Sequence, residues 1–185
     1  KRLHKEVLEL LLFSRHEYPE LLDAYLDRAK HSIKIVSISL RITDRECALA
    51  ELFRRKLASS SSFEINDSLL EPSTGAATLA ARALNVEPAV LSKEINDMLG
   101  DLKMLRSTLP PMQQGRFHLY VHDCFPMGSA IMLDAAPTSG LIQVETKLYG
   151  APRSESFSFE VVAPSTFYNR NFAAWNTVIA ESKIV

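Results

Sequence analysis

Apolar residues recur every three to four positions over residues 3–13, with charged residues between them, which predicts an amphipathic helix. A second helix is predicted over residues 19–30, where a proline occupies the first helical position. We interpret residues 1–15 as an N-terminal helix, or as a linker helix from an upstream domain. Residues 16–185 then form one folded domain.

The next part of the chain predicts a strand–helix–strand unit. Residues 32–40 are rich in β-branched side chains and nearly alternate, which is typical of a largely buried strand. Thr43 and Glu46 form a capping box that starts a helix through Leu57. Residues 63–65 follow as a short strand, and a crossover of this size favours parallel pairing of the two strands.

The second half begins with helices and ends mostly in strands. A loop with a short helix is predicted over residues 71–84, and Pro88 opens a long helix to about Ser107. Four strands are then predicted at 117–121, 130–133, 142–148 and 157–161, followed by a last helix at 166–179. Consecutive strands joined by turns imply some antiparallel pairing. We therefore predict one α/β domain with a mixed sheet of about six or seven strands, flanked by helices.

Composition supports a packed domain and narrows the classes of partner. Hydrophobic residues make up 46% of the 185 positions, and the formal net charge is −1. This charge gives no reason to expect nucleic acid or an anionic membrane, so both are excluded as partners. No run approaches the ~18 apolar residues that a membrane span needs. The two cysteines, Cys47 and Cys124, suit a reducing compartment, so we expect a cytoplasmic protein.

The segment Met127-Gly-Ser-Ala-Ile-Met-Leu-Asp134 is the most informative motif. It resembles a degenerate form of the His-x-Lys-x-x-x-x-Asp motif of the phospholipase D-like superfamily, with Met127 at the histidine position and Ser129 at the lysine position. The order of predicted elements is also similar to one domain of that family, an α/β sandwich. In that family the histidine attacks phosphorus and the lysine neutralises phosphoryl oxygens. The resemblance therefore implies a cleft without the nucleophile and without the cation, and only Asp134 is carried over.

Polar side chains on the predicted strands are the candidates for binding a ligand, and we expect no catalytic residue, metal site or cofactor. The candidates are His118, Tyr120, His122, Ser129, Asp134, Glu145 and Lys147. A metal bound by His118 and His122 is disfavoured, because residues four apart on a strand lie roughly 13 Å apart. Cys124 beside His122 could form a nucleophile pair, but no third group is visible in the sequence.

The leading hypothesis is a non-catalytic regulatory or sensor domain of a larger cytoplasmic protein. It would bind a small ligand or form a homodimer through the degenerate cleft, and so bias an output domain attached upstream of Lys1. One alternative is a diverged phosphodiesterase or nuclease that uses His118 or His122. Another is a purely structural oligomerisation domain.

Overall fold

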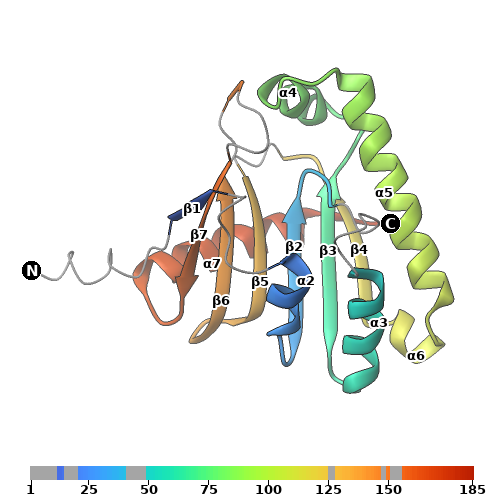
Figure 1. The fold of residues 1–185 in the computed structure, drawn as a ribbon, viewed down its shortest axis with the longest axis vertical. Coiled ribbons are helices and arrows are strands. Elements are labelled where there is room, and N and C mark those ends of the chain that lie inside the picture. The colour runs from blue at the N-terminus through green and yellow to red at the C-terminus, as the bar shows by residue number, and fades with distance from the viewer. Residues whose placement is uncertain (1–11, 15–20, 41–48, 125–127, 147–148, 151–155) are drawn as a thin grey trace, which may run out of the picture.

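A mixed sheet forms the centre of the molecule, with helices on both faces (Figure 1). The computed structural model describes residues 12–14, 21–40, 49–124, 128–146, 149–150 and 156–185. The strands are β1 Leu12–Ser14, β2 Ser32–Ser37, β3 Glu64–Leu70, β4 Phe117–His122, β5 Gly128–Ala136, β6 Ser139–Thr146, β7 Phe157–Val162 and β8 Lys183–Ile184. The helices are α2 Leu22–Asp27, α3 Leu49–Ser59, α4 Gly75–Ala83, α5 Pro88–Thr108, α6 Pro111–Gln114 and α7 Thr166–Glu181.

The order of strands across the sheet is β1-β7-β6-β5-β2-β3-β4-β8. Strands β2, β3 and β4 are parallel, whereas β5, β6 and β7 form an antiparallel meander beside β2. The predicted α/β class and mixed sheet are therefore confirmed. Within the described residues the sheet has eight strands rather than six or seven, because a short strand is added at each edge.

Each face of the sheet has its own hydrophobic core. The larger core lies under α2 to α5 and includes Ile33 and Ile35 of β2, both almost fully buried. The smaller core lies under α7, which crosses behind the sheet in Figure 1, and includes Val36 and Met132. This alternation arises because successive side chains of a strand point to opposite faces. We call the face under α2 to α5 the front face and the face under α7 the back face.

Two local differences from the sequence prediction have tertiary causes. Residues 12–14, expected at the end of a helix, form β1 and pair antiparallel with β7, which gives the backbone of this edge strand its hydrogen bonds. Strand β3 continues five residues beyond Ile65, through the polar sequence Asn66-Asp67-Ser68, because both of its neighbours pair with it along its length. The capping box at Thr43 and Glu46 lies outside the described residues.

The described residues include no helix that is both long enough and apolar enough to cross a membrane.

Candidate functional site

Four polar side chains line up across the front face where β2 ends. Ser129 of β5 pairs with Glu145 of β6, and Glu145 pairs in turn with Ser158 of β7. One residue beyond the last β2–β5 pair, Val36 with Ala130, Ser37 lies beside Ser129. All four side chains alternate with residues of the back face, so they share the front face. We call Ser37, Ser129, Glu145 and Ser158 the carboxyl-edge row, because the parallel strands end at this edge of the sheet.

The carboxyl-edge row combines hydroxyl groups with an acid. Ser37 and Ser158 are buried, whereas Ser129 and Glu145 are half-buried. The Ser37 hydroxyl has no hydrogen-bond partner among the described residues. A buried hydroxyl without a partner is unusual, since nearly all such groups in proteins are hydrogen-bonded. The row therefore offers acceptors and hydroxyl donors, and Ser129 supplies no positive charge at the position where the resemblance implies a lysine.

Asp67 lies deeper on the same face, in the middle of β3. It pairs with Ile35 of β2 on one side and with Leu119 of β4 on the other. Its side chain is 1% exposed, and neither carboxyl oxygen has a partner among the described residues. Desolvation by burial raises the pKa of Asp67 to about 7. Among the acids that the structure describes, Asp67 is thus the one whose ionised form is most clearly destabilised by folding.

His122 and Cys124 lie at the same edge and form a neutral pair. The two ring nitrogens of His122 face backbone carbonyl oxygens, Nδ1 that of Cys124 at 3.1 Å and Nε2 that of Ser37 at 3.3 Å. The Cys124 Sγ lies 3.4 Å from Nδ1. Burial lowers the pKa of His122 and raises the pKa of Cys124, so both groups are neutral at pH 7.

This pairing is unsuited to a cysteine nucleophile. A neutral imidazole donates from only one nitrogen, so only one of the two carbonyl oxygens can accept a hydrogen bond from the His122 ring. An activated cysteine needs a lowered pKa, the opposite of the shift at Cys124. Among the described residues no group of three or more His, Cys, Asp or Glu side chains is placed to hold a metal ion.

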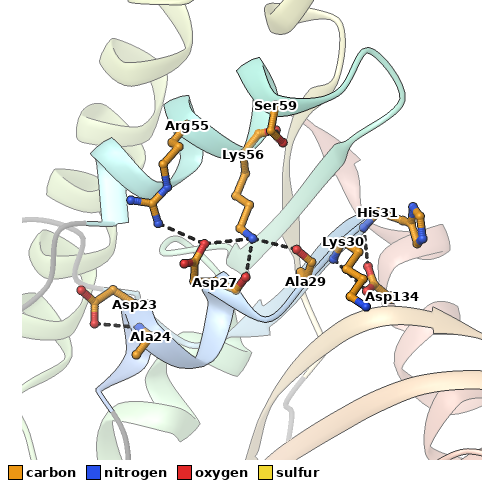
Figure 2. Close-up of polar contacts among 10 residues, drawn as sticks. All are labelled: Asp23, Ala24, Asp27, Ala29, Lys30, His31, Arg55, Lys56, Ser59 and Asp134. Atoms are coloured by element: carbon orange, nitrogen blue, oxygen red, sulfur yellow. Dashed lines mark hydrogen bonds and ion pairs between the residues drawn. The ribbon is translucent and has the colours of Figure 1, made fainter.

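Asp134 lies at the opposite end of β5 from Ser129, roughly 16 Å along the strand. Its carboxylate accepts three backbone N–H groups at the start of β2, from Lys30 at 2.8 Å, His31 at 2.6 Å and Ser32 at 2.9 Å (Figure 2). Its own backbone has a φ of 51°, in the left-handed region that aspartate tolerates better than most residues. The position therefore fits a structural carboxylate that joins the β5–β6 hairpin to β2.

The remaining candidates do not join Ser129 and Glu145. His118 and Tyr120 of β4 alternate with the front-face residues Phe117 and Leu119, so they lie on the back face. Lys147 lies outside the described residues, as does Met127. The structure thus brings together Ser129 and Glu145. The His122 ring contacts the backbone carbonyl oxygen of Ser37, and the other candidates lie apart from this row.

Sequence reasoning missed Ser37, Asp67 and Ser158 as members of this region. The signal for Asp67 was present, because a charged residue interrupts an otherwise strand-like run between Ile65 and Leu69. The strand predicted at residues 63–65 ends before Asp67. Ser37 and Ser158 carry no local signal, since single serines are common on strands.

A separate polar cluster joins α2 to α3 (Figure 2). The Lys56 ammonium donates to the carbonyl oxygens of Asp27 and Ala29, and it lies 2.9 Å from the Asp27 carboxylate. Arg55 lies 3.0 Å from the same carboxylate, and the hydrogen bonds from Lys56 and then Arg55 lower the pKa of Asp27. A shallow hollow of about 140 Å³ adjoins the cluster, lined by Asp23, Ala24, Asp27, Glu51, Leu52 and Arg55. The contacts fix the end of α2, where carbonyl groups lack helical partners.

Lys56→Met is expected to lower the free energy of unfolding by about 2 kcal/mol, because it removes two hydrogen bonds from a charged donor to the carbonyl oxygens of Asp27 and Ala29. The Lys56 side chain is only 13% exposed, so water cannot replace it fully. The matched change Arg55→Met, at a side chain that is 59% exposed, should cost about 0.5 kcal/mol or less. Urea unfolding of both variants measures the difference, and equal losses would contradict the assignment.

Comparison with known proteins gives a similarity of overall fold. No protein-family model matches the chain, and no curated protein matches it. The solved structure of Nuc from Salmonella typhimurium, a phospholipase D family member, is 11% identical with a TM-score of 0.49, and the match covers 95% of each chain. TrmBL2, an archaeal chromatin protein, is 11% identical with a TM-score of 0.48; the match covers 96% of this chain and 54% of TrmBL2.

One sequence-based exclusion was wrong. The net charge of −1 leads to the prediction that nucleic acid is not a partner. TrmBL2, one of the similar structures, is described as showing a novel mode of DNA binding. A net charge describes the whole chain, whereas contacts with nucleic acid depend on the local distribution of charge. The exclusion is therefore withdrawn.

Proposed function

We propose that this chain is a non-catalytic regulatory domain of a larger cytoplasmic protein, and that it binds a small ligand along the carboxyl-edge row. The observation that carries the proposal is the row itself, where Ser37, Ser129, Glu145 and Ser158 from four neighbouring strands lie side by side. Side chains that converge from several strands at one edge of a sheet are a common way to build a binding site.

The chemistry of the row favours a ligand with hydrogen-bond donors and without negative charge. Glu145 is half-buried, and a carboxylate there repels phosphate. The unpartnered Ser37 hydroxyl and the neighbouring Ser129 hydroxyl both accept and donate. A polyol or an amine meets these demands, whereas a phosphoester would need a cation at the position of Ser129.

The state of the other polar groups supports binding rather than phosphoryl chemistry. Such a reaction needs a free nucleophile and a cation at the developing charge. His122 is neutral and has both ring nitrogens against carbonyl oxygens, and the Asp134 carboxylate accepts three N–H groups. His118 and His122 are four residues apart on strand β4, which separates their backbones by roughly 13 Å, so the two rings do not converge on one phosphorus atom.

The test is isothermal titration of the purified protein with glucose and putrescine, and with glycerol 3-phosphate as the phosphoester. Saturable binding of glucose or putrescine is expected, with about tenfold weaker affinity in Glu145→Gln because a row acceptor loses its charge. Ser129→Lys should shift the preference toward glycerol 3-phosphate. Glu51→Gln, at an acid that is 71% exposed on α3, is the control and should bind like the wild type.

Two results would contradict the proposal. One is binding of none of the three compounds by a folded protein. The other is cleavage of bis(p-nitrophenyl) phosphate that His122→Ala abolishes, which would instead support the diverged phosphodiesterase.

Self-association is a second candidate function, favoured by exposed apolar residues near the same edge. Tyr149 is 83% exposed and Leu79 of α4 is 52% exposed. The Gly150 N–H donates to the Ala83 carbonyl oxygen at 2.7 Å, which places the turn holding Tyr149 against the end of α4. Light scattering of the same titration samples distinguishes a homodimer from a monomer, with and without ligand.

A further inference from the structure

A second polar row crosses the back face, on the other side of the sheet from the carboxyl-edge row. Lys34 of β2 pairs with Asn66 of β3, and Asn66 pairs with His118 of β4. Side chains paired across parallel strands share a face, and neighbouring strands lie about 4.8 Å apart. The three side chains therefore begin within about 10 Å of one another. We call Lys34, Asn66 and His118 the back-face row.

All three side chains of the back-face row are half-buried and reach the surface. The Lys34 ammonium donates to Asn176 Oδ1 of α7 at 2.7 Å and lies 6.0 Å from the centroid of the Phe172 ring. Asn176 is itself oriented, because its amide donates to the Phe172 carbonyl oxygen at 2.7 Å. Helix α7 thus holds the ammonium in place and leaves it further donors.

The row presents donors rather than acceptors. The Tyr120 hydroxyl donates to Asn66 Oδ1 at 3.4 Å, so the amide NH₂ of Asn66 is the group left to face a ligand. The Tyr120 ring also lies 6.3 Å from the His118 ring, measured between centroids. An ammonium, an amide NH₂ and an imidazole at this spacing can surround a group with two or more oxygen atoms.

The charge at Lys34 lacks a close counter-ion. No carboxylate among the described residues lies within ion-pair distance of its ammonium, and desolvation by burial lowers the pKa of Lys34. The exposed Glu64, two residues before Asn66 on β3, acts on Lys34 only at longer range and raises that pKa. Partial burial of an unpaired cation costs free energy, which a bound anion would offset.

We propose that the back-face row binds a small oxyanion, either a carboxylate or a phosphate group, through Lys34, Asn66 and His118. The site is independent of the carboxyl-edge row, because the two rows lie on opposite faces of the sheet. The domain would then have two binding sites with opposite ligand preferences. The back face would bind an anion, and the front face would bind a ligand rich in hydrogen-bond donors.

The experiment is an NMR titration of the full chain with inorganic phosphate and, separately, with succinate, at constant ionic strength. The Asn66 side-chain amide and His118 ring signals should shift and saturate with phosphate, with succinate, or with both, and the arm that saturates identifies the oxyanion. Lys34→Met should weaken that binding at least tenfold. Asn66→Asp, which replaces the amide donor with a negative charge, should abolish it. Lys93→Met, at a lysine that is 76% exposed on α5, is the control and should bind normally.

The proposal is overturned if sodium chloride alone causes the same shifts, or if neither anion saturates. It is also overturned if the Lys34→Met and Lys93→Met variants bind equally well. Where Lys34→Met fails to fold by circular dichroism, the folded Asn66→Asp variant decides, and undiminished binding by it overturns the proposal.

Discussion

Replacing Asp67 with Asn is expected to stabilise the protein at pH 8 and to remove most of its loss of stability between about pH 4 and pH 7. The carboxyl group is buried on the front face, where its partners on the two neighbouring strands are the apolar residues Ile35 and Leu119. No charged group of the described residues offsets this burial, so desolvation alone raises its pKa from 3.8 to about 7. At 1.36 kcal/mol per pH unit, the full effect is roughly 4 kcal/mol.

The sign follows from proton binding. The folded protein keeps the Asp67 proton up to about pH 7, whereas the unfolded chain releases it near pH 3.8. Between these values the unfolded chain binds fewer protons, so the free energy of unfolding falls as the pH rises. Below pH 3.8 the penalty is absent, and above about pH 7 it is complete.

Urea unfolding at several pH values between 4 and 8 measures this effect. The wild type should lose stability steadily as the pH rises, and Asp67→Asn should lose much less. Asp123→Asn changes an acid whose side chain is 65% exposed, so it should follow the wild-type curve. Parallel curves for the wild type and Asp67→Asn would contradict a buried, unpartnered carboxyl group.

Asp134→Ala is expected to lower the free energy of unfolding by roughly 3 kcal/mol or more. The change removes the acceptor of three backbone N–H groups, and it places alanine at a φ of 51°. The adjoining hairpin cannot relax easily. Gly140 has a φ of 104°, and a Cβ atom there would lie 2.6 Å from the Asp134 carbonyl oxygen.

Asp134→Asn separates the two causes, because asparagine tolerates this backbone but carries no charge. It should therefore cost less than Asp134→Ala. Asp97→Ala, at a surface acid paired with Lys93, is the control and should cost about 0.5 kcal/mol or less. Thermal or urea unfolding gives the order. A loss for Asp134→Ala no larger than that control would rule out the structural role.

The local sequence pattern was sufficient to predict an element where one of its faces is buried and the other is exposed to solvent. Residues 117–122 alternate cleanly and form β4, and the apolar stripe after Pro88 forms α5 nearly as expected. The parallel pairing of β2 with β3 followed from the length of the helical connection between them. These features depend on the spacing of apolar and polar residues along the chain, which the sequence shows directly.

The local sequence pattern could not predict which residues come together in the candidate site. Ser129 and Asp134 belong to one short motif, yet the first lies in the carboxyl-edge row and the second joins the other end of the sheet to residues more than 100 positions away. Strand register decides which serines become neighbours, and a shift by one residue would turn each to the opposite face.

The sequence by itself determined the α/β class, most of the elements and the absence of a lysine at Ser129. Only the tertiary structure decided that the Asp67 side chain is buried without a partner among the described residues, and that the Asp134 carboxylate accepts backbone N–H groups. It also decided that Lys34, Asn66 and His118 share the back face. The physical reason is that periodicity is a property of neighbours along the chain. Burial, register and hydrogen-bond partners depend instead on segments that meet only when the sheet forms.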